Sequence, residues 1–280
     1  MPDTMPDGRP WPRLSIVSPS FNQGAFIEAA IRSILLQGYP RLELIVIDGG
    51  STDGSVEIIR KYEPWLTVWR SEPDEGPAHA LNKGFALATG EIVGFLNTDD
   101  FYLPWSLTRM AREFRRYPTA DVISGHGYHA GPSGELGAAI FSDRWDAWRF
   151  AYGACVLIQQ ATFFRRRAFA ETDGFNQQLR TSWDMELWAD MARNGARFHA
   201  CNEFLAVFRL HADSITGSLE LSRQCRKDVE TILRRVRGRP ETAIDDALTL
   251  VQRFWKFLAH PGRTVSQRLF LHETLGRWSL

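Results

Sequence analysis

The chain has 280 residues, of which 44% are hydrophobic and 24% charged, an ordinary composition for a soluble globular protein. Its 33 basic and 33 acidic side chains cancel, so no overall field would attract nucleic acid, and we expect no nucleic-acid partner. An anionic ligand must therefore be held by a local site. The three cysteines, at positions 155, 201 and 225, are too far apart for a compact zinc site and odd in number for a disulfide framework. They suggest a reducing compartment.

The first residues carry turn-forming and charged side chains without an apolar segment. Residues 1–13 include four prolines and two aspartates, which predicts a disordered leader and argues against a signal peptide. No uncharged apolar run along the chain is long enough to span a bilayer. We therefore expect a cytoplasmic protein with, at most, peripheral contact with the inner face of the membrane.

Strand and helix patterns alternate over roughly the first hundred residues. Strands are predicted at 14–18, 42–48, 66–69 and 92–96, and helices at 25–37, 55–61 and 76–88. This alternation predicts an α/β fold with a mostly parallel sheet flanked by helices. Ligands of such sheets bind beyond the carboxyl ends of the strands. The polar segments there, 18–22, 48–53, 72–76 and 97–100, should converge on one rim.

Beyond Pro118 the pattern becomes mixed. Strands are predicted at 121–124 and 162–164, helices at 165–171 and 183–193, and a pair of strands at 197–210. From Gly217 onward the chain is predicted to be helical, with breaks at Pro240 and Pro261.

The strongest chemical signal is the pair Asp99-Asp100, directly after an apolar strand. Adjacent carboxylates repel each other unless a cation or hydrogen-bond donors compensate them. Carboxylates together with phosphate oxygens are the ligands that Mg²⁺ or Mn²⁺ prefers. The pair therefore suggests a metal site, with a solvated turn as the alternative.

A second signal is the glycine-rich segment 48–54, also at a strand end. Glycines allow a ligand to approach the backbone, and Asp48 can accept a hydrogen bond from a base edge or a ribose hydroxyl. The alternative is a strand-to-helix turn in which Asp53 caps the next helix. The two interpretations are compatible.

Several blocks together resemble glycosyltransferase family 2. The similarity is carried, in order, by Ser15–Asn22, Glu43–Gly54, Ser71–Asp74 with Gly76, Asn82–Gly84, Gly90-Glu91 and Leu96–Asp100. It covers residues 14–110 densely and implies the GT-A fold, a Rossmann-like sheet with flanking helices. The expected organisation is a catalytic domain at 14–216, with a nucleotide-sugar half at 14–117 and an acceptor half at 118–216, followed by a helical extension at 217–280.

The resemblance implies roles for particular residues of the first half. Pro19, Ser20 and Asp48 would hold the nucleoside, with Asp48 on the base. Asp74 and the stretch from Gly76 to Asn82 would line the nucleotide and phosphate side. Asp99 and Asp100 would contact the ribose, the diphosphate and a Mn²⁺ or Mg²⁺ ion. Asn97 stands where the family often has an acidic residue, so the carboxylate ligands here are Asp99 and Asp100.

Weaker matches in the second half imply the remaining roles. Segments 160–166, 174–176 and 183–188 resemble the acceptor region, which makes Asp184 the catalytic base. A positioned carboxylate is needed because an acceptor hydroxyl is a poor nucleophile until its proton is taken. An acid favoured by the helix dipole is the alternative for Asp184, and Glu186 is the second candidate base. Segment 209–215 implies that His211 approaches the metal or the diphosphate, as suits a cation such as Mn²⁺.

The function implied is inverting transfer of a sugar from a nucleotide diphosphate donor to an acceptor hydroxyl. A UDP-sugar is favoured, with dTDP and GDP open, and the acceptor would be a glycan or a lipid-linked molecule in surface polysaccharide or glycan synthesis. A non-catalytic nucleotide-sugar-binding protein is one alternative. A phosphohydrolase is another, because Asp48 ends a strand as aspartyl nucleophiles do, but Gly50 stands where such enzymes need a second acid.

The C-terminal helices contain more basic than acidic residues, with Trp255, Phe257 and Phe270 among them. They could rest on a membrane surface near a lipid-linked acceptor. A helical cap on the core or a dimer contact is the interpretation that we favour from the sequence, because basic helix faces are usually only solvated.

Overall fold

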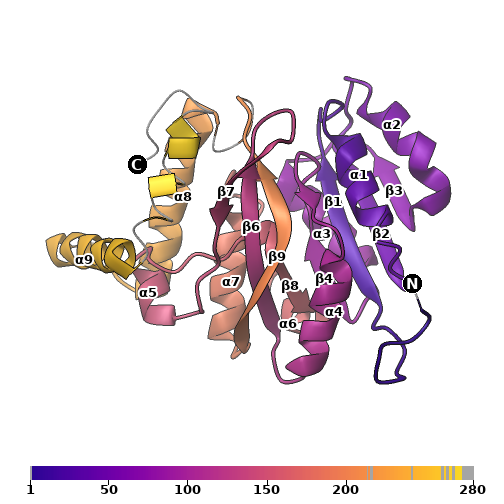
Figure 1. The fold of residues 1–280 in the computed structure, drawn as a ribbon. Coiled ribbons are helices and arrows are strands. Elements are labelled where there is room, and N and C mark those ends of the chain that lie inside the picture. Colours follow the sequence, from indigo (N-terminus) through magenta and orange to yellow (C-terminus); the bar gives the residue numbers. More distant parts are fainter. Residues whose placement is uncertain are drawn as a thin grey trace.

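The computed structural model describes residues 2–212, 214, 217–240, 242–259, 262, 265–266 and 269–272 (Figure 1). Its strands are β1 (Leu14–Ser20), β2 (Leu42–Asp48), β3 (Val68–Ser71), β4 (Ile92–Phe95), β5 (Phe101–Tyr102), β6 (Val122–Ala130), β7 (Leu136–Ile140), β8 (Thr162–Arg165) and β9 (Phe198–Arg209). Its α-helices are α1 (Ile27–Leu35), α2 (Ser55–Tyr62), α3 (Pro77–Leu87), α4 (Ser106–Arg116), α5 (Ala147–Ala151), α6 (Arg166–Ala170), α7 (Trp183–Arg193), α8 (Leu219–Arg237) and α9 (Ala243–Ala259). Two short 3₁₀ helices span Glu63–Trp65 and Gln159–Ala161.

The strands of the described residues form one sheet in the order β3-β2-β1-β4-β8-β6-β9-β5, with β7 beside β6. The first four strands are parallel to one another. Beyond β4 the sheet is mixed, because β8 runs antiparallel to both β4 and β6 while β9 returns parallel to β6. The predicted α/β fold is confirmed, and the parallel half is the part that the strand–helix alternation identified.

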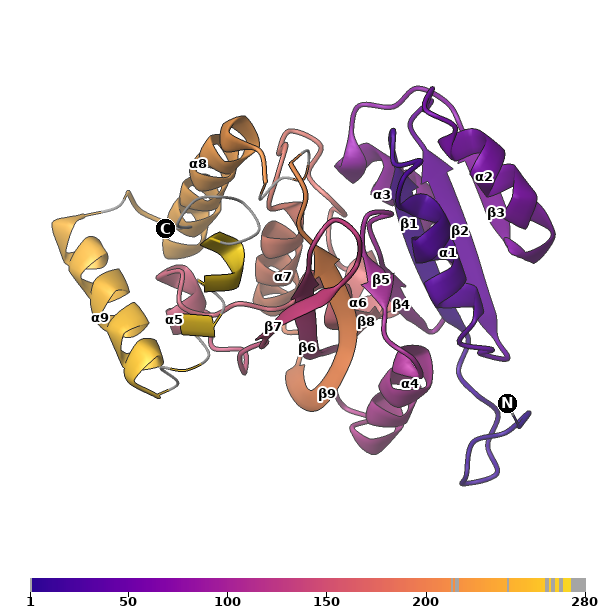
Figure 2. The ribbon, with the colours of Figure 1, turned by 45° about the horizontal axis from the view of Figure 1, so that its top comes forward.

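The sheet is covered by helices on both faces (Figure 2). Alternate residues of β1 point to opposite faces, so that Leu14 and Ile16 join the core under α1 and α4, whereas Val17 joins the core under α3 and α7. Helix α3 lies so close to β1 that a Cβ at Gly84 would collide with the side chain of Val17. This close packing fixes where α3 begins relative to the strand ends.

The first residues are packed, whereas the sequence predicts a disordered leader over 1–13. Trp11 is 1% exposed, and its ring lies edge-on to Tyr39 with centroids 5.6 Å apart. The Tyr39 hydroxyl donates to the carbonyl of Pro12 at 2.8 Å, and Asp7 pairs with Arg115 at 2.7 Å. One large aromatic side chain thus anchors a segment whose composition otherwise indicates disorder.

The second half contains elements that the sequence did not predict, β7 and α5 among them, and one that it divided wrongly. Residues 197–210 were predicted as a pair of strands, but β9 is a single strand of 12 residues that runs along β6 with two register shifts. The segment contains no glycine or proline to make a turn. Helices α8 and α9 follow it, and within the described residues no helix is both long and apolar enough to cross a bilayer.

Candidate active site

A cavity of about 460 Å³ lies at the carboxyl ends of β1, β2 and β4, beside the start of α3. Of the predicted nucleotide-binding residues, Pro19, Ser20, Asp74, Gly76 and Asp99 line it. All four polar segments that follow the parallel strands contribute to its wall, so their predicted convergence on one rim is confirmed. Sequence reasoning did not assign Gln23 and Leu221 to the site, and it gave no individual role to Trp183 or Ser214.

Hydrogen bonds between neighbouring strand ends hold this wall in place. The Gly49 N–H donates to the carbonyl of Ser20 at 2.8 Å, and the Thr98 hydroxyl donates to the carbonyl of Pro19 at 3.1 Å. The Ser20 hydroxyl is buried and has no hydrogen-bond partner among the described residues. Because an unpaired buried polar group is costly, this hydroxyl is available to a polar ligand in the cavity.

The start of α3, where the family resemblance implies a phosphate side, borders the cavity. Gly76 precedes the helix with φ +116°, a conformation that favours glycine, and its N–H donates to Asp74 Oδ1 at 2.8 Å. An ideal Cβ at Gly49 would lie 3.0 Å from Asp74 Oδ2, so the absence of a side chain there leaves room beside the carboxylate. Pro77 has no N–H and the Gly76 N–H is used by Asp74, so the helix start can offer the N–H groups of Ala78 and His79 to an anionic ligand such as a phosphate.

Asp99, which lines the cavity, lies beside the buried His211. Asp99 Oδ2 lies 3.2 Å from His211 Nε2, although the two residues are 112 positions apart in the chain. His211 is buried against the ring of Phe26, with centroids 4.6 Å apart. A carboxylate oxygen beside an imidazole nitrogen is a donor set that suits Mn²⁺. Within the described residues no group of three or more His, Cys, Asp and Glu gathers, so this pair would need ligand oxygens to complete a coordination shell.

Asp100 does not face the cavity, contrary to its predicted role as a metal ligand. Its side chain is buried, Oδ2 accepts from Gln160 Nε2 at 2.7 Å, and Oδ1 accepts from the Arg209 N–H at 2.8 Å. Burial, followed by the nearby charge of Asp99, raises the pKa of Asp100 well above its ordinary value. The adjacent carboxylates are separated by the local backbone, and only Asp99 is open to a ligand.

Asp48 and Asn82 also lie outside the cavity wall. Asp48 is fully buried, and its carboxylate accepts hydrogen bonds from the backbone of Gly50 and Ser51 and from the hydroxyls of Ser51 and Ser71. It therefore shapes the glycine-rich loop instead of presenting a free oxygen to a base.

The side-chain amide of Asn82 is used in the same way. Its Nδ2 donates to the Phe175 carbonyl at 2.8 Å, and its Oδ1 accepts from the Phe175 N–H at 2.9 Å. The residue links α3 to the loop before α7, so the predicted nucleotide contact of Asn82 is not seen in this geometry.

Asp184 lies in the first turn of α7, next to the cavity residue Trp183. Burial raises the pKa of its carboxyl to about 6, partly opposed by hydrogen bonds from the backbone N–H groups of Met185 and Asp184 itself. A carboxylate with such a pKa is ionised at neutral pH yet basic enough to accept a proton, which suits a general base.

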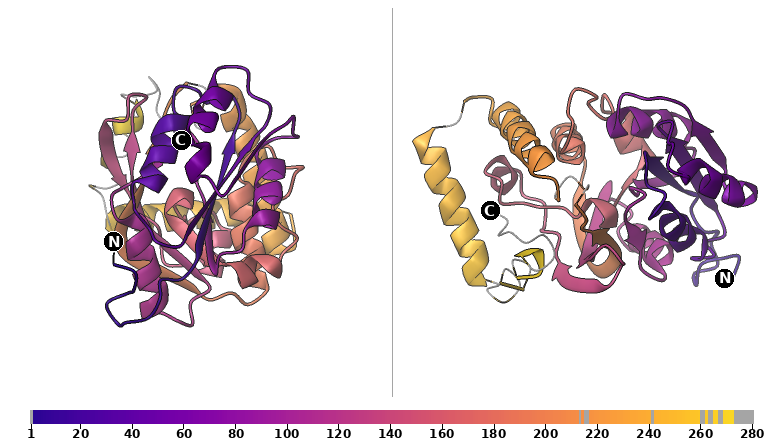
Figure 3. Two further views of the ribbon diagram at one scale, coloured as in Figure 1. Left: turned by 90° about the vertical axis from the view of Figure 1, so that its right-hand side faces the viewer. Right: turned by 90° about the horizontal axis from the view of Figure 1, so that it is seen from above.

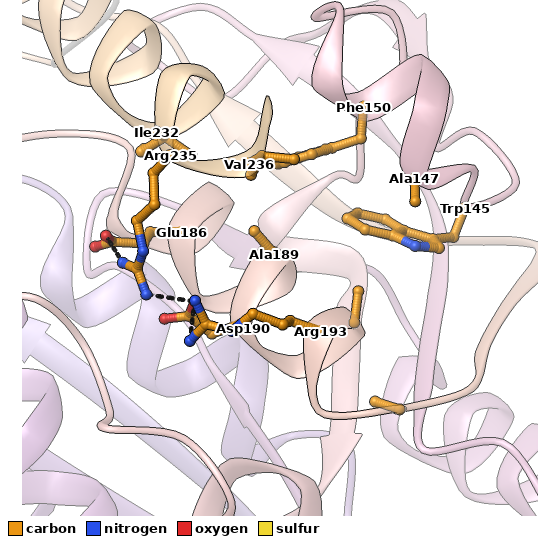
Figure 4. Close-up of a pocket in the computed structure, with 12 residues that line it drawn as sticks. Trp145, Ala147, Phe150, Glu186, Ala189, Asp190, Arg193, Ile232, Arg235 and Val236 are labelled. Atoms are coloured by element: carbon orange, nitrogen blue, oxygen red, sulfur yellow. Dashed lines mark hydrogen bonds and ion pairs between the residues drawn. The ribbon is translucent and has the colours of Figure 1, made fainter. Parts of the chain in front are cut away.

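Glu186, the second candidate base, points elsewhere. Figure 4 shows Glu186 and Asp190 projecting from α7 toward Arg235 of α8, in a separate pocket of about 270 Å³. Arg235 donates to a carboxylate oxygen of each residue. Glu186 is therefore held in an ion pair away from the cavity that contains Asp99.

The parallel sheet, the cavity at its strand ends and the helical flanks define a GT-A glycosyltransferase domain. Two solved structures share this fold with a TM-score of 0.63 each. The mannosyltransferase PcManGT from Pyrobaculum calidifontis is 20% identical over 96% of this chain and 76% of its own. TarS 1–349 from S. aureus, in complex with UDP-GlcNAc, is 19% identical over 80% of this chain and 65% of its own.

The chain belongs to glycosyl transferase family 2, whose model matches residues 15–173. A Bacillus subtilis protein named for teichuronic acid biosynthesis, TuaG, is 27% identical over 74% of this chain and 82% of its own length. A PGL/p-HBAD biosynthesis glycosyltransferase of Mycobacterium bovis is 31% identical over 63% of this chain and 69% of its own. The protein is thus a glycosyltransferase that uses a nucleotide sugar.

Proposed function

We propose that this enzyme is an inverting, metal-dependent glycosyltransferase that transfers a sugar from a UDP-sugar to an acceptor hydroxyl during synthesis of a surface polysaccharide or glycan. The observation that supports the proposal most directly is that Asp99 lines a cavity at the carboxyl ends of three parallel strands and lies 3.2 Å from His211. Such a cavity is where open α/β sheets bind nucleotides.

In this proposal the donor lies between the strand ends and the start of α3. Pro19 and Ser20 contact the nucleoside. The Ser20 hydroxyl, which has no hydrogen-bond partner among the described residues, forms one hydrogen bond with it. Asp74 and Gly76 border the phosphates, which face the N–H groups at the start of α3. Asp48 acts indirectly by holding the loop that contains Gly49.

Asp99 and His211 would hold a Mn²⁺ or Mg²⁺ ion, with diphosphate oxygens as further ligands. When bound, the ion supplies positive charge where negative charge develops on the leaving diphosphate. The ring of Phe26 packs against His211 and would help to keep the imidazole beside Asp99.

Asp184 is the proposed base. Its carboxylate accepts the proton of the acceptor hydroxyl while that oxygen attacks the anomeric carbon from the face opposite the diphosphate. Attack from the opposite face inverts the anomeric configuration. Trp183, the neighbouring residue in the cavity wall, would border the acceptor or the donor sugar.

The UDP preference and the acceptor are inferred from related proteins. TarS has been solved in complex with UDP-GlcNAc, and PcManGT in complex with GDP-Man and Mn²⁺. We favour UDP because TarS has been solved in complex with UDP and with UDP-GlcNAc. We favour a surface polymer because TuaG, 82% of whose length aligns with this chain, is named for teichuronic acid biosynthesis. A polymer of that kind would place the enzyme in the cytoplasm, at the inner face of the membrane, with a glycan or lipid-linked acceptor.

The test is a panel of nucleotide sugars with purified enzyme, in the presence of Mn²⁺ or of EDTA, with product detection by mass spectrometry. We expect transfer from a UDP-sugar that EDTA stops and that Asp99→Asn abolishes, whereas the exposed-site control Asp173→Asn keeps full activity. Transfer that persists in EDTA would contradict the metal role. Tight binding of UDP without turnover would instead favour a binding protein, and release of inorganic phosphate a phosphohydrolase.

A further inference from the structure

The charges of the chain are divided unequally, although they sum to zero. Residues 217–280 carry 12 basic and 7 acidic side chains, a formal charge of +5, whereas residues 1–216 carry 21 and 26, a formal charge of −5. A charge asymmetry of this kind indicates an anionic partner, either nucleic acid or a membrane. The excess of positive charge coincides with the segment that contains α8 and α9.

Helix α9 turns its apolar side outward. Leu250 is 67% exposed, Phe254 57% and Trp255 64%, and further exposed apolar residues of the helix are Ile244, Val251, Phe257 and Leu258. At 100° per residue these positions share one side of the helix. The helix is the outermost element of the described chain, at the opposite end of the molecule from α2 and β3 (Figures 1 and 3).

The polar side of α9 is less exposed than its apolar side. Asp245 is fully buried, accepts two hydrogen bonds from Arg239 and two from Thr242, and so fixes the start of the helix. Thr249 and Gln252, one and two turns further along the same side, are partly buried. A surface helix that packs on its own domain shows the reverse arrangement, with the apolar stripe inward. The sequence-based preference for a helical cap on the core therefore does not describe α9.

We propose that the outward side of α9 (Ile244, Leu250, Val251, Phe254, Trp255, Phe257 and Leu258) inserts into the surface of an anionic lipid bilayer. Aromatic and aliphatic residues on one side of a helix in a basic segment are typical of helices that lie in the membrane interface. Nucleic acid would be attracted by the charge but would not cover an apolar surface of this kind. A second copy would cover it, but would bring two segments of charge +5 together.

Exposed basic residues of α8 support the same partner. Arg223, Arg226, Lys227 and Arg234 are exposed on the helix that precedes α9. Basic residues near a membrane surface add attraction to anionic lipids that falls with salt. Membrane binding through α9 does not require the proposed catalytic function. Only its biological role rests on that function, because a membrane-bound enzyme would meet a lipid-linked acceptor at that surface.

The test is flotation of the full-length enzyme with vesicles of phosphatidylglycerol and phosphatidylcholine, compared with phosphatidylcholine alone. We expect binding to the anionic vesicles only, reduced but not abolished by 0.5 M salt, a concentration chosen to screen the ionic part. The variant Leu250→Gln/Phe254→Gln, which leaves the charge unchanged, should lower the partition coefficient at least about tenfold. The matched control Leu36→Gln/Trp65→Gln removes equally exposed apolar side chains at other sites and should bind as the unaltered enzyme does.

Several outcomes would overturn the inference. The unaltered enzyme could fail to float with anionic vesicles, a result that does not depend on whether the variant folds. The Leu250→Gln/Phe254→Gln variant could float as well as the control, or light scattering could show a dimer that this variant dissolves. Nucleotide release from the donor in solution, measured on both variants, should stay unchanged. This measurement of nucleotide release separates a failure of membrane binding from a failure of the proposed catalytic function.

Discussion

Replacing the proposed base should make the protein more stable while making it inactive. Asp184 lies in the first turn of α7, where burial raises the pKa of its carboxyl from 3.8 to about 6. Its ionised form is therefore disfavoured in the folded protein relative to the unfolded chain, in which the carboxyl is hydrated. Asp184→Asn removes this charge while keeping nearly the same shape.

The magnitude follows from the pKa values. A tenfold difference in acidity corresponds to about 1.4 kcal/mol, so the ionised carboxylate lowers the free energy of unfolding by about 3 kcal/mol. Between pH 4 and pH 6 the folded state binds more protons than the unfolded state, so the stability of the unaltered enzyme falls as pH rises. The stability of Asp184→Asn should not follow this fall. The two proteins should be equally stable below pH 4 and differ by about 3 kcal/mol above pH 6.5.

The assay is urea denaturation at several pH values between 4 and 8, with sugar transfer measured on the same samples. We expect kcat of Asp184→Asn to fall by about 10²–10⁴-fold, and kcat/KM of the unaltered enzyme to rise with pH up to about 6 and then level. The exposed-site variant Asp173→Asn should change neither quantity. Equal stability of Asp184→Asn and the unaltered enzyme at pH 8 would refute the reasoning, because the carboxylate would then be well solvated.

Three further predictions concern the cavity and its supports. Gly49→Ala should raise KM for the donor about tenfold with little change in kcat, because the new Cβ would lie 3.0 Å from Asp74 Oδ2 and displace that carboxylate. An unchanged KM would show that the Asp74 side chain can move without weakening donor binding. Asn82→Ala should lower the free energy of unfolding in urea by about 2 kcal/mol, through loss of two hydrogen bonds to Phe175, and leave the Kd for UDP within twofold. His211→Ala should raise the Mn²⁺ concentration for half-maximal activity at least about tenfold, measured by metal titration of transfer, and an unaltered titration would remove His211 from the ligand set.

The parallel half of the fold and the rim of the cavity were predictable because local patterns determine them. Continuous apolar runs followed by polar residues identified β1, β2 and β4, and parallel strands bring their carboxyl ends to one edge. Pro19, Ser20 and Asp99 reach the cavity for this reason alone. The same rule does not say which side chain at a strand end is turned outward.

The direction of each side chain depends on long-range contacts that the sequence pattern does not contain. Asp48 and Asn82 matched the family blocks, yet their oxygens accept hydrogen bonds from the protein itself. Trp11 gave no recognisable signal within a proline-rich leader, because its burial depends on Tyr39. Leu221 reaches the cavity from α8, which only the tertiary arrangement of the second half brings there.

The two neighbouring acids illustrate how one motif serves both folding and chemistry. Asp100 is turned into the core, where it accepts the Arg209 N–H and so ties the end of β9 to the loop after β4. The Arg209 guanidinium strengthens the tie by donating to the carbonyl of Asp99 at 2.7 Å. His211 lies two residues beyond Arg209 and is thereby brought beside the Asp99 carboxylate. The buried acid thus helps to position the imidazole of His211 beside Asp99, the acid that lines the cavity.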